Sequence, residues 1–416
     1  MIRVPLSLAL LACLFLGAGA CTTPMQEGWR SYSHAEYSDA LAAWKPLAQK
    51  GDSDAQYLVG LIYDEGRGVP KDRKQAAQWY TLAAEQGHAA AQNNLGLLYF
   101  DGAEIVQSNA EAARWFRAAA RQGFTPAQNN LALMLLLKQT TPSTGEDPRR
   151  ILRTSAEHGD AKAMALLGSM AQQGIGNPEN HSEAAEWYRT AAEQGVASSQ
   201  SALAVKYFLG DGVQKNHAQA LRWSLCAAEQ GVAEAQFLAG WMYRHGKGVG
   251  QDDAKAAVWF QRAADQGHAA AQTNLGLMLF EGAGVPNDDV LAAHWMQLAA
   301  VQGFALAQEN LGIAYLRGRG VNKSAGEAAN WIELAAHQGL ASAQQRLGAM
   351  YEHGRGVEQD EVAAYLWYSL ACSRGQTDAA TLRESLAKRL SEVEIAHAEN
   401  LYRAYEGKTS IVENSR

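Results

Sequence analysis

A stretch of 36 residues decides the fold of this chain. Residues 52–87 read DSDAQYLVGLIYDEGRGVPKDRKQAAQWYTLAAEQG. The glycine that ends this stretch returns every 36 residues without a slip, as Gly51, Gly87, Gly123, Gly159, Gly195, Gly231, Gly267, Gly303, Gly339 and Gly375. Tryptophan keeps the same period at Trp79, Trp115, Trp187, Trp223, Trp259, Trp295, Trp331 and Trp367, and Ile151 occupies the one remaining place. The chain therefore contains nine tandem repeats between residues 52 and 375, a pattern typical of a solenoid.

The apolar residues within each repeat have helical spacing. The two stripes of the first repeat are Ala55, Val59, Ile62 and Tyr63, followed by Ala76, Trp79, Tyr80, Ala83 and Ala84. Between them lies Gly66-Arg67-Gly68-Val69, which predicts a tight turn between two antiparallel helices. We expect Trp79 to fill the space that the small alanines leave. No single repeat can bury its own stripe, so each repeat needs its neighbours.

These signature residues resemble a known repeat. The pattern Ala55-Gln56, Gly60, Tyr63, Gly66-x-Gly68-Val69, Trp79-Tyr80, Ala83-Ala84 and Gly87 is similar to the Sel-1-like repeat, a relative of the tetratricopeptide repeat. The resemblance implies an all-α, right-handed solenoid of helix pairs with first helices along its concave face. It also implies an adaptor or scaffold rather than an enzyme. Bacterial secreted members often serve envelope assembly or host contact. The disulfide in each repeat that some secreted members carry is missing here.

The first residues predict export and lipid attachment. Arg3 precedes a short apolar stretch, and small residues lead up to Cys21. The segment resembles a bacterial lipobox, which implies removal of residues 1–20 and a lipid on Cys21, although Ala18 stands where leucine is usual. Plain secretion with a free Cys21 is the alternative. Thr22 is not the Asp that retains some lipoproteins at an inner membrane, so the outer membrane facing the periplasm is favoured over the cell surface or secretion.

The two ends of the array differ from its middle, as capping segments do. Residues 21–51 are expected to hold the anchored N-terminus and one capping helix over 27–50, which Pro46 kinks or restarts. Residues 376–416 are expected to form two capping helices, near 377–389 and 392–406, and then a disordered tail after Gly407. Ser391 and Glu394 have the spacing of a capping box for the second of these helices.

The repeat at 124–159 departs from the pattern. Its glycine loop is replaced by residues 138–148, which read KQTTPSTGEDP, and Ile151 replaces tryptophan. Its length is unchanged, so we expect the stack to continue through it. A functional hinge and drift in a tolerant surface loop both remain open.

Composition and motifs argue against an enzyme or a nucleic-acid-binding protein. The chain has 36 Lys and Arg against 43 Asp and Glu, with no long run of either sign. No H-E-x-x-H or G-x-S-x-G motif occurs, and the glycines of each loop lack the preceding strand of a nucleotide site. We therefore expect no catalytic residue, no metal and no cofactor.

The concave face is the predicted binding site. We number positions from the glycine before each repeat, so that Ala55 is at position four. With positions four, eight and twelve turned to the core, positions six, ten and thirteen are expected on the opposite face, beside a ladder of asparagines. The predicted groove residues are Asn94, Phe100, Asn130, Phe208, Phe237, Trp241, Asn274, Phe280 and Asn310. The competing interpretations are solvated polar residues for the asparagines and packing between first helices for the leucines at position ten.

The leading hypothesis is a non-enzymatic scaffold of the bacterial cell envelope. Its groove would bind an extended segment of another envelope protein, because exposed aromatics and amides suit an unpaired peptide backbone. One alternative is binding of peptidoglycan or exported polysaccharide on aromatic platforms. Others are a host-contact surface protein and a purely structural spacer.

Overall fold

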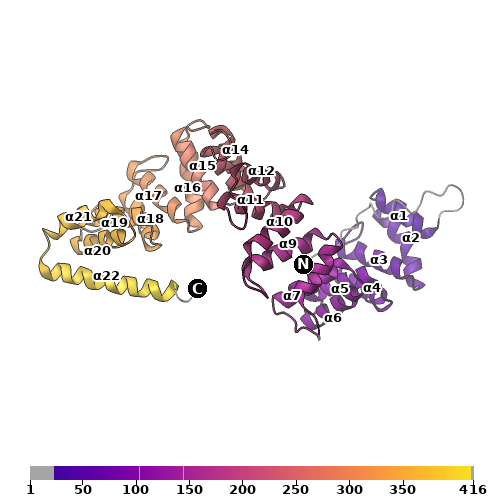
Figure 1. Cartoon of the computed structure of the whole chain (residues 1–416). Helices are drawn as coiled ribbons and strands as arrows, with labels where there is room; N and C mark the ends of the chain where they lie inside the picture. Colours follow the sequence, from indigo (N-terminus) through magenta and orange to yellow (C-terminus); the bar gives the residue numbers. More distant parts are fainter. Residues whose placement is uncertain (1–22, 103, 144, 414–416) are drawn as a thin grey trace. The chain divides into compact units, whose positions relative to one another are not determined.

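The computed structural model describes residues 23–102, 104–143 and 145–413. Every regular element within these ranges is an α-helix (Figure 1). The chain divides into two compact units, which we call the N-terminal half (residues 1–199) and the C-terminal half (residues 200–416). The predicted signal peptide and Cys21 lie outside the described residues. The prediction of an all-α solenoid of helix pairs is confirmed.

The N-terminal half holds two leading helices, four complete repeats and the start of the fifth. Its helices are α1 (Pro24–Ser33), α2 (Tyr37–Gln49), α3 (Ser53–Glu65), α4 (Arg73–Glu85), α5 (Ala89–Asp101), α6 (Asn109–Arg121), α7 (Thr125–Leu136), α8 (Pro148–Glu157), α9 (Ala161–Gln173) and α10 (His181–Glu193). The division falls within α11 (Ala197–Leu209).

The C-terminal half holds the remaining repeats and two closing helices. Its helices are α12 (His217–Glu229), α13 (Ala233–Arg244), α14 (Asp253–Asp265), α15 (Ala269–Glu281), α16 (Asp289–Val301), α17 (Ala305–Arg317), α18 (Ala325–His337), α19 (Ala341–His353), α20 (Glu361–Ser373), α21 (Thr377–Ala387) and α22 (Glu392–Glu413). Within each half, consecutive helices pack against one another, as a solenoid requires.

Caps and left-handed glycines set the helix boundaries of a repeat. In repeat 1, the Asp52 side chain accepts a first-turn N–H of α3, and Asp72 does the same for α4. Gly66 ends α3 with φ +72°, a conformation that favours glycine. The connection between the helices runs from Gly66 to Asp72, so it is longer than the predicted turn. The backbone N–H of Asp72 closes it by donating to the Tyr63 carbonyl at 2.9 Å.

An aromatic ring packed against a glycine joins the two helices of a repeat. A Cβ at Gly60 would lie 2.7 Å from the Tyr80 ring, and Tyr80 is fully buried. The same contact recurs as Gly96 with Phe116, Gly168 with Tyr188, Gly240 with Phe260, and Gly348 with Tyr368. Trp79 is half-buried and packs against the core cluster that contains Ala83 and Ala84, as expected, but the residue that packs on Gly60 is Tyr80.

A pair of glutamines ties repeat 2 to repeat 1. The Gln92 amide donates to the Ala84 carbonyl of repeat 1 at 2.9 Å and accepts from Gln122 at 2.8 Å. A buried amide satisfied in both roles stabilises the interface, whereas an unsatisfied one would destabilise it. The same pairing occurs in Gln56–Gln86, Gln200–Gln230, Gln236–Gln266, Gln272–Gln302 and Gln308–Gln338. These glutamines recur every 36 residues and can be found from the sequence, but their role in joining repeats was not predicted.

Repeat 3 keeps its place in the stack despite its altered sequence. Lys138 stands where other repeats have the loop glycine and takes the left-handed conformation, with φ +54°. The loop delays the second helix, which begins at Pro148 after its N-cap, Asp147. Ala132 and Leu152, both fully buried, replace the usual glycine and ring. Because α8 packs against α7 and α9, the stack continues through repeat 3 as expected.

The N-terminal cap contains two helices rather than the predicted one. The Thr23 side chain and Gln26 form a capping box that starts α1, with a proline in its first turn. The chain breaks near Ala35, which has φ +63°, and then enters α2. Pro46 lies inside α2 and does not restart it. The fully buried Trp44 packs edge-on against Trp29 of α1, at 5.3 Å between ring centroids.

The C-terminal cap follows the prediction except at its end. The Ser391 backbone N–H donates to the Glu394 carboxylate at 2.7 Å, and the Glu394 N–H donates to the Ser391 hydroxyl at 3.3 Å. This is the predicted capping box. The helix that it starts, α22, runs to Glu413, so the expected tail after Gly407 is helical up to that residue. Tyr405 of α22 stacks on His337 of α18, which holds the closing helix on the last repeats.

Candidate functional site

Two of the predicted groove asparagines are structural. Asn94 is buried and donates to the Tyr80 hydroxyl at 3.3 Å. Asn130 is buried and donates to the side-chain Oδ1 of Asn93 at 3.0 Å. These amides therefore join α5 to α4 and α7 within the N-terminal half. Their part in partner binding stays a prediction, but their amides already have protein partners.

The other two asparagines bond to their own helices. Asn274 donates to the Ala270 carbonyl at 2.8 Å, and Asn310 donates to the Leu306 carbonyl at 2.8 Å. Both side chains are half-buried in the C-terminal half. Each amide thus uses one donor on the preceding turn, and its oxygen keeps acceptor capacity.

The sequence predicts that position six lies on an open face. In the structure, the side chain at this position contacts the next repeat instead. Phe237 stacks on the His268 ring at 4.8 Å, and Tyr57 stacks on His88 at 4.7 Å. Burial lowers the pKa of His268 despite the nearby carboxylate of Glu234. The neutral ring can accept, and its Nδ1 takes the Ala271 N–H at 3.2 Å, which caps α15. Reasoning from one helix missed this contact because the neighbouring first helix covers position six.

Positions ten and thirteen bring aromatic residues together in the C-terminal half. Phe208 meets Trp241 edge-on, at 5.4 Å between centroids and 88° between planes. Trp241 also stacks on His245 at 4.1 Å, which is a second contact that restrains the indole. Both Phe208 and Trp241 are half-buried, so each presents part of its ring to solvent. The structure therefore joins these two predicted groove residues.

Two exposed aliphatic residues extend this aromatic pair. Val205 and Leu209 lie on α11 together with Phe208, at i, i+3 and i+4 spacing, and therefore share one face. Leu209 is 60% exposed. We call Val205, Phe208, Leu209 and Trp241 the aromatic patch. Val205 and Leu209 were not predicted, although position ten of repeat 5 could have suggested Val205.

Of the remaining predicted aromatics, Phe280 is covered on one face and Phe100 packs against the core. The Arg319 guanidinium lies 4.6 Å from the centroid of the Phe280 ring and forms an ion pair with Asp289 at 2.9 Å. This cation–π contact covers the face that a ligand would use. Phe100 is half-buried against the core around Phe116 in the N-terminal half.

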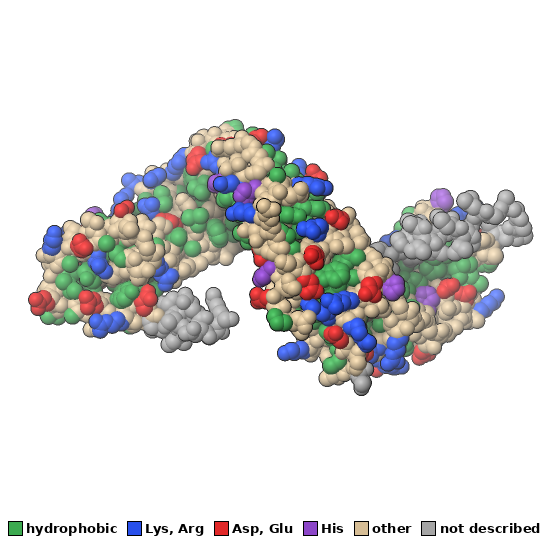
Figure 2. Space-filling model, in the orientation of Figure 1, with side chains coloured by type: hydrophobic (Ala, Val, Ile, Leu, Met, Phe, Trp, Pro, Cys, Tyr) green, Lys and Arg blue, Asp and Glu red, His purple; other side chains and the backbone are tan. Residues whose placement is uncertain are grey.

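Charge and metal chemistry give no competing site. On the face shown in Figure 2, acidic and basic side chains are interspersed over each half and form no large patch of one sign. Across the ranges that the structure describes, no group of three or more His, Cys, Asp or Glu is placed to hold a metal ion. Nor is any helix there long and apolar enough to cross a bilayer.

Comparisons with known proteins agree with this architecture. A family model described as Sel1 repeat matches eight windows: 53–88, 89–124, 161–196, 197–232, 233–268, 269–304, 305–340 and 341–376. Most of repeat 3 falls in the gap between these windows. A search of curated proteins found no match.

Two solved structures resemble the chain over most of its length. One is a protective antigen present in uropathogenic Escherichia coli strains that displays an SLR fold. It is 31% identical, over 92% of this chain and 91% of that one, with a TM-score of 0.56. The other is a Sel1 repeat protein from Oxalobacter formigenes, 30% identical over 82% of this chain and 99% of that one, also with a TM-score of 0.56. The chain belongs to the Sel1 repeat family.

Proposed function

We propose that this protein is a lipid-anchored scaffold of the bacterial cell envelope that binds an apolar segment of another protein at its aromatic patch. Sel1 repeat proteins are generally protein-interaction scaffolds, and the helical solenoid is typically non-enzymatic. The observation that carries the proposal is the contact of Phe208 with Trp241, beside the exposed Leu209 on the same helix as Phe208. Apolar surface of this kind usually marks an interaction site on a soluble protein.

The patch has the composition of a binding hot spot. Tryptophan anchors dominate the energetics of many protein interfaces, because a large ring loses little conformational freedom when it is buried. Here Phe208 and His245 already contact the Trp241 ring. A pre-ordered ring lowers the entropic cost of association. An amphipathic helix or an extended apolar peptide is the partner that this surface fits.

Substitution of the patch is expected to reduce partner recovery strongly. Full-length protein carrying Trp241→Ala or Leu209→Asp should recover the envelope partner at least about tenfold less well than wild type in a quantitative pull-down. Val290→Ala on α16, where the side chain is 71% exposed outside the patch, is the matched control and should change nothing. Equal recovery by the Leu209→Asp variant, with its helix content intact by circular dichroism, would contradict the proposed site.

The proposed location rests on the N-terminal sequence. The small residues before Cys21 favour a lipid-modified mature N-terminus. The likeness to a protein described as a protective antigen also supports a place outside the cytoplasm, because an antigen protects only where immune effectors reach it. Retention on purified sacculi that persists in Trp241→Ala would instead favour a polysaccharide ligand elsewhere on the chain.

Cys21→Ala is expected to release the protein from the membrane. A single thioether-linked lipid group would supply the anchor, and without it nothing else in the proposal holds the chain to a bilayer. Cell fractionation and metabolic labelling with a fatty acid should show the wild type labelled in the membrane fraction and the variant unlabelled in the soluble fraction. Labelling that survives the substitution would refute the anchor.

A further inference from the structure

Repeat 3 lacks the tryptophan that its neighbours share, and this leaves space in the fold. Its second helix carries Ile151 at that position. In repeat 2 the equivalent residue, Trp115, is largely buried and belongs to a core cluster with Ala84 and Leu95, with Ala118 packed against it. Trp115 therefore belongs to the same core as Ala84 of the preceding second helix.

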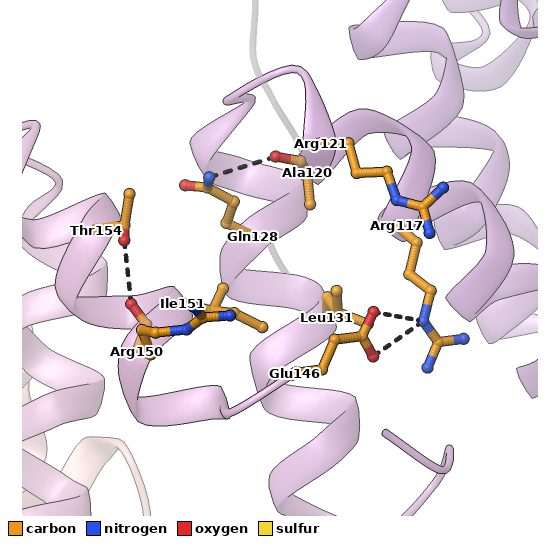
Figure 3. Close-up of a pocket in the computed structure, with 9 residues that line it drawn as sticks. All are labelled: Arg117, Ala120, Arg121, Gln128, Leu131, Glu146, Arg150, Ile151 and Thr154. Carbon is orange, nitrogen blue, oxygen red and sulfur yellow. Dashed lines mark hydrogen bonds and ion pairs between the residues drawn. The ribbon is translucent and has the colours of Figure 1, made fainter. Parts of the chain in front are cut away.

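A cavity occupies the equivalent place in repeat 3. It has a volume of about 240 Å³, and its walls include Ala120, Leu131 and Thr154. These residues stand one repeat after Ala84 and Leu95, which belong to the same core cluster as Trp115, and Ala118, which packs against that cluster. Ile151 also lines the cavity, and Figure 3 shows its side chain near Leu131. We call this cavity the Ile151 pocket; it lies where the missing indole would be.

The rim of the pocket is rich in arginine. Arg117, Arg121 and Arg150 line it together with a single carboxylate, Glu146. Figure 3 shows Glu146 reaching towards Arg117, whose Nε donates to both carboxylate oxygens at 2.9 and 3.1 Å. Burial alone would raise the pKa of Glu146, but the hydrogen bonds from Arg117 and Ser143 outweigh it and lower the pKa. The carboxylate is thus ionised and neutralises one of the three guanidinium groups.

The other two arginines keep their capacity to bind an anion. Arg150 donates to the Gly145 carbonyl at 2.5 Å, which uses one of its five N–H donors. In the part of the chain that the structure describes, Arg121 makes no side-chain hydrogen bond or ion pair, although its charge acts on Glu146. Both side chains are exposed at the mouth. The pocket therefore combines an apolar wall with an excess of positive charge.

We propose that the Ile151 pocket binds an aromatic carboxylate. The ring would take the place of the indole that repeat 3 lacks, against Leu131 and Ile151, and the carboxylate would meet Arg121 at the rim. Sites for drug-sized ligands measure roughly 300–1,000 Å³, so this smaller cavity suits one aromatic group. The C-terminal aromatic residue of a protein and a free aromatic acid share this chemistry. The site is separate from the aromatic patch, and its test does not depend on the partner proposed there.

N-acetyl-L-tryptophan and its uncharged amide are the probes that test the proposal. The acid should bind the full-length protein saturably, with a dissociation constant on the order of 0.1 mM for a ligand of this size. The amide should bind roughly tenfold more weakly, because it loses the charge-assisted contact with arginine. Isothermal titration calorimetry or ligand-observed NMR can measure both. No saturable binding of the acid, or equal binding of acid and amide, would overturn the proposal.

Variants locate the binding. Ile151→Trp restores the side chain of the other repeats and should abolish binding without lowering the melting temperature. Arg121 is exposed, so Arg121→Gln should not disturb the fold. It should weaken the binding of the acid roughly tenfold and leave the affinity for the amide unchanged. Arg114→Gln, one repeat before Arg150, is the matched control and should leave both affinities unchanged. Undiminished binding by Ile151→Trp or by Arg121→Gln would place the probe elsewhere and refute the assignment.

Peptides distinguish the two sources. A peptide that ends in a free tryptophan carboxylate should bind at least as tightly as the small acid if the natural ligand is a protein C-terminus, and the same peptide with an amidated end should bind more weakly. If the small acid binds and the peptide does not, the natural ligand is a free aromatic acid. Failure of both to bind would overturn the proposal.

Discussion

Gly240→Ala is expected to destabilise the C-terminal half by about 2 kcal/mol, within the range for overpacking a core. The added Cβ would lie 2.8 Å from the Phe260 ring and 3.2 Å from the Ala256 carbonyl oxygen. All of these groups are buried where the two helices of repeat 6 meet, so the ring cannot move away without opening the core. Urea unfolding of the full-length protein, followed by circular dichroism, measures the loss as a lower midpoint.

Repeat 3 suggests the compensating change. It pairs Ala132 with Leu152 at the positions of Gly240 and Phe260. Phe260→Leu should therefore recover much of the stability lost by Gly240→Ala, with a coupling of about 1–2 kcal/mol between the two sites. Gly326→Ala is the control, because that helical glycine has nothing within 4 Å of its Cβ direction. It should stabilise by up to about 1 kcal/mol. If both glycine substitutions had the same effect, the ring-on-glycine contact would not be what holds the helix pair.

Arg346→Asn is expected to lower the free energy of unfolding by about 2 kcal/mol, because it leaves the buried Glu309 carboxylate without its ion-pair partner. Glu309 is only 4% exposed, and its oxygens accept from Arg346 Nε at 2.8 Å and from the Ser342 hydroxyl at 2.7 Å. Removing one partner of a buried pair costs more than the pair contributes, because the other charge stays buried. Arg346 is itself about half exposed, so solvent screening places the expected loss below the roughly 3–5 kcal/mol of a fully buried pair.

The preceding repeat offers the replacement pair. Thr273 and Asn310 occupy the positions of Glu309 and Arg346 one repeat earlier. Adding Glu309→Thr to Arg346→Asn should return the urea midpoint close to that of wild type, since no unpaired charge then remains. Urea is the denaturant of choice because a guanidinium salt would screen the ion pair. A double variant no more stable than Arg346→Asn alone would show that the buried carboxylate is not the source of the loss.

The sequence predicted the repeat architecture well, because the period reports the helices directly. Invariant spacing located every repeat glycine, and the structure gives each of these a left-handed backbone. The sequence predicted the packing of side chains less well, because the apolar pattern of one helix does not show which neighbouring helix will cover each of its faces. Phe237 was assigned to an open face, yet the next repeat's His268 lies against it. The sequence predicted that Trp79 fills the space left by the small alanines, but it gave no sign that Tyr80 is the residue packed on Gly60.

The candidate site was predicted only in part for the same reason. Phe208 and Trp241 contact each other, as the groove hypothesis required. The amides of Asn94 and Asn130 instead form hydrogen bonds between helices. The Ile151 pocket could not be predicted from the repeat alone. The absence of one indole was visible in the sequence, but whether neighbouring side chains had closed the space depends on packing in three dimensions.

Site-specific photocrosslinking in living cells tests the central claim most directly. A photoreactive residue at Leu209, in full-length protein at its natural abundance, should trap one discrete envelope protein. That adduct should disappear when Trp241→Ala is added, and it should not form when the photoreactive residue is placed at Val290. Adducts that are the same at both positions, or that are indifferent to Trp241→Ala, would contradict a scaffold that binds its partner at the aromatic patch.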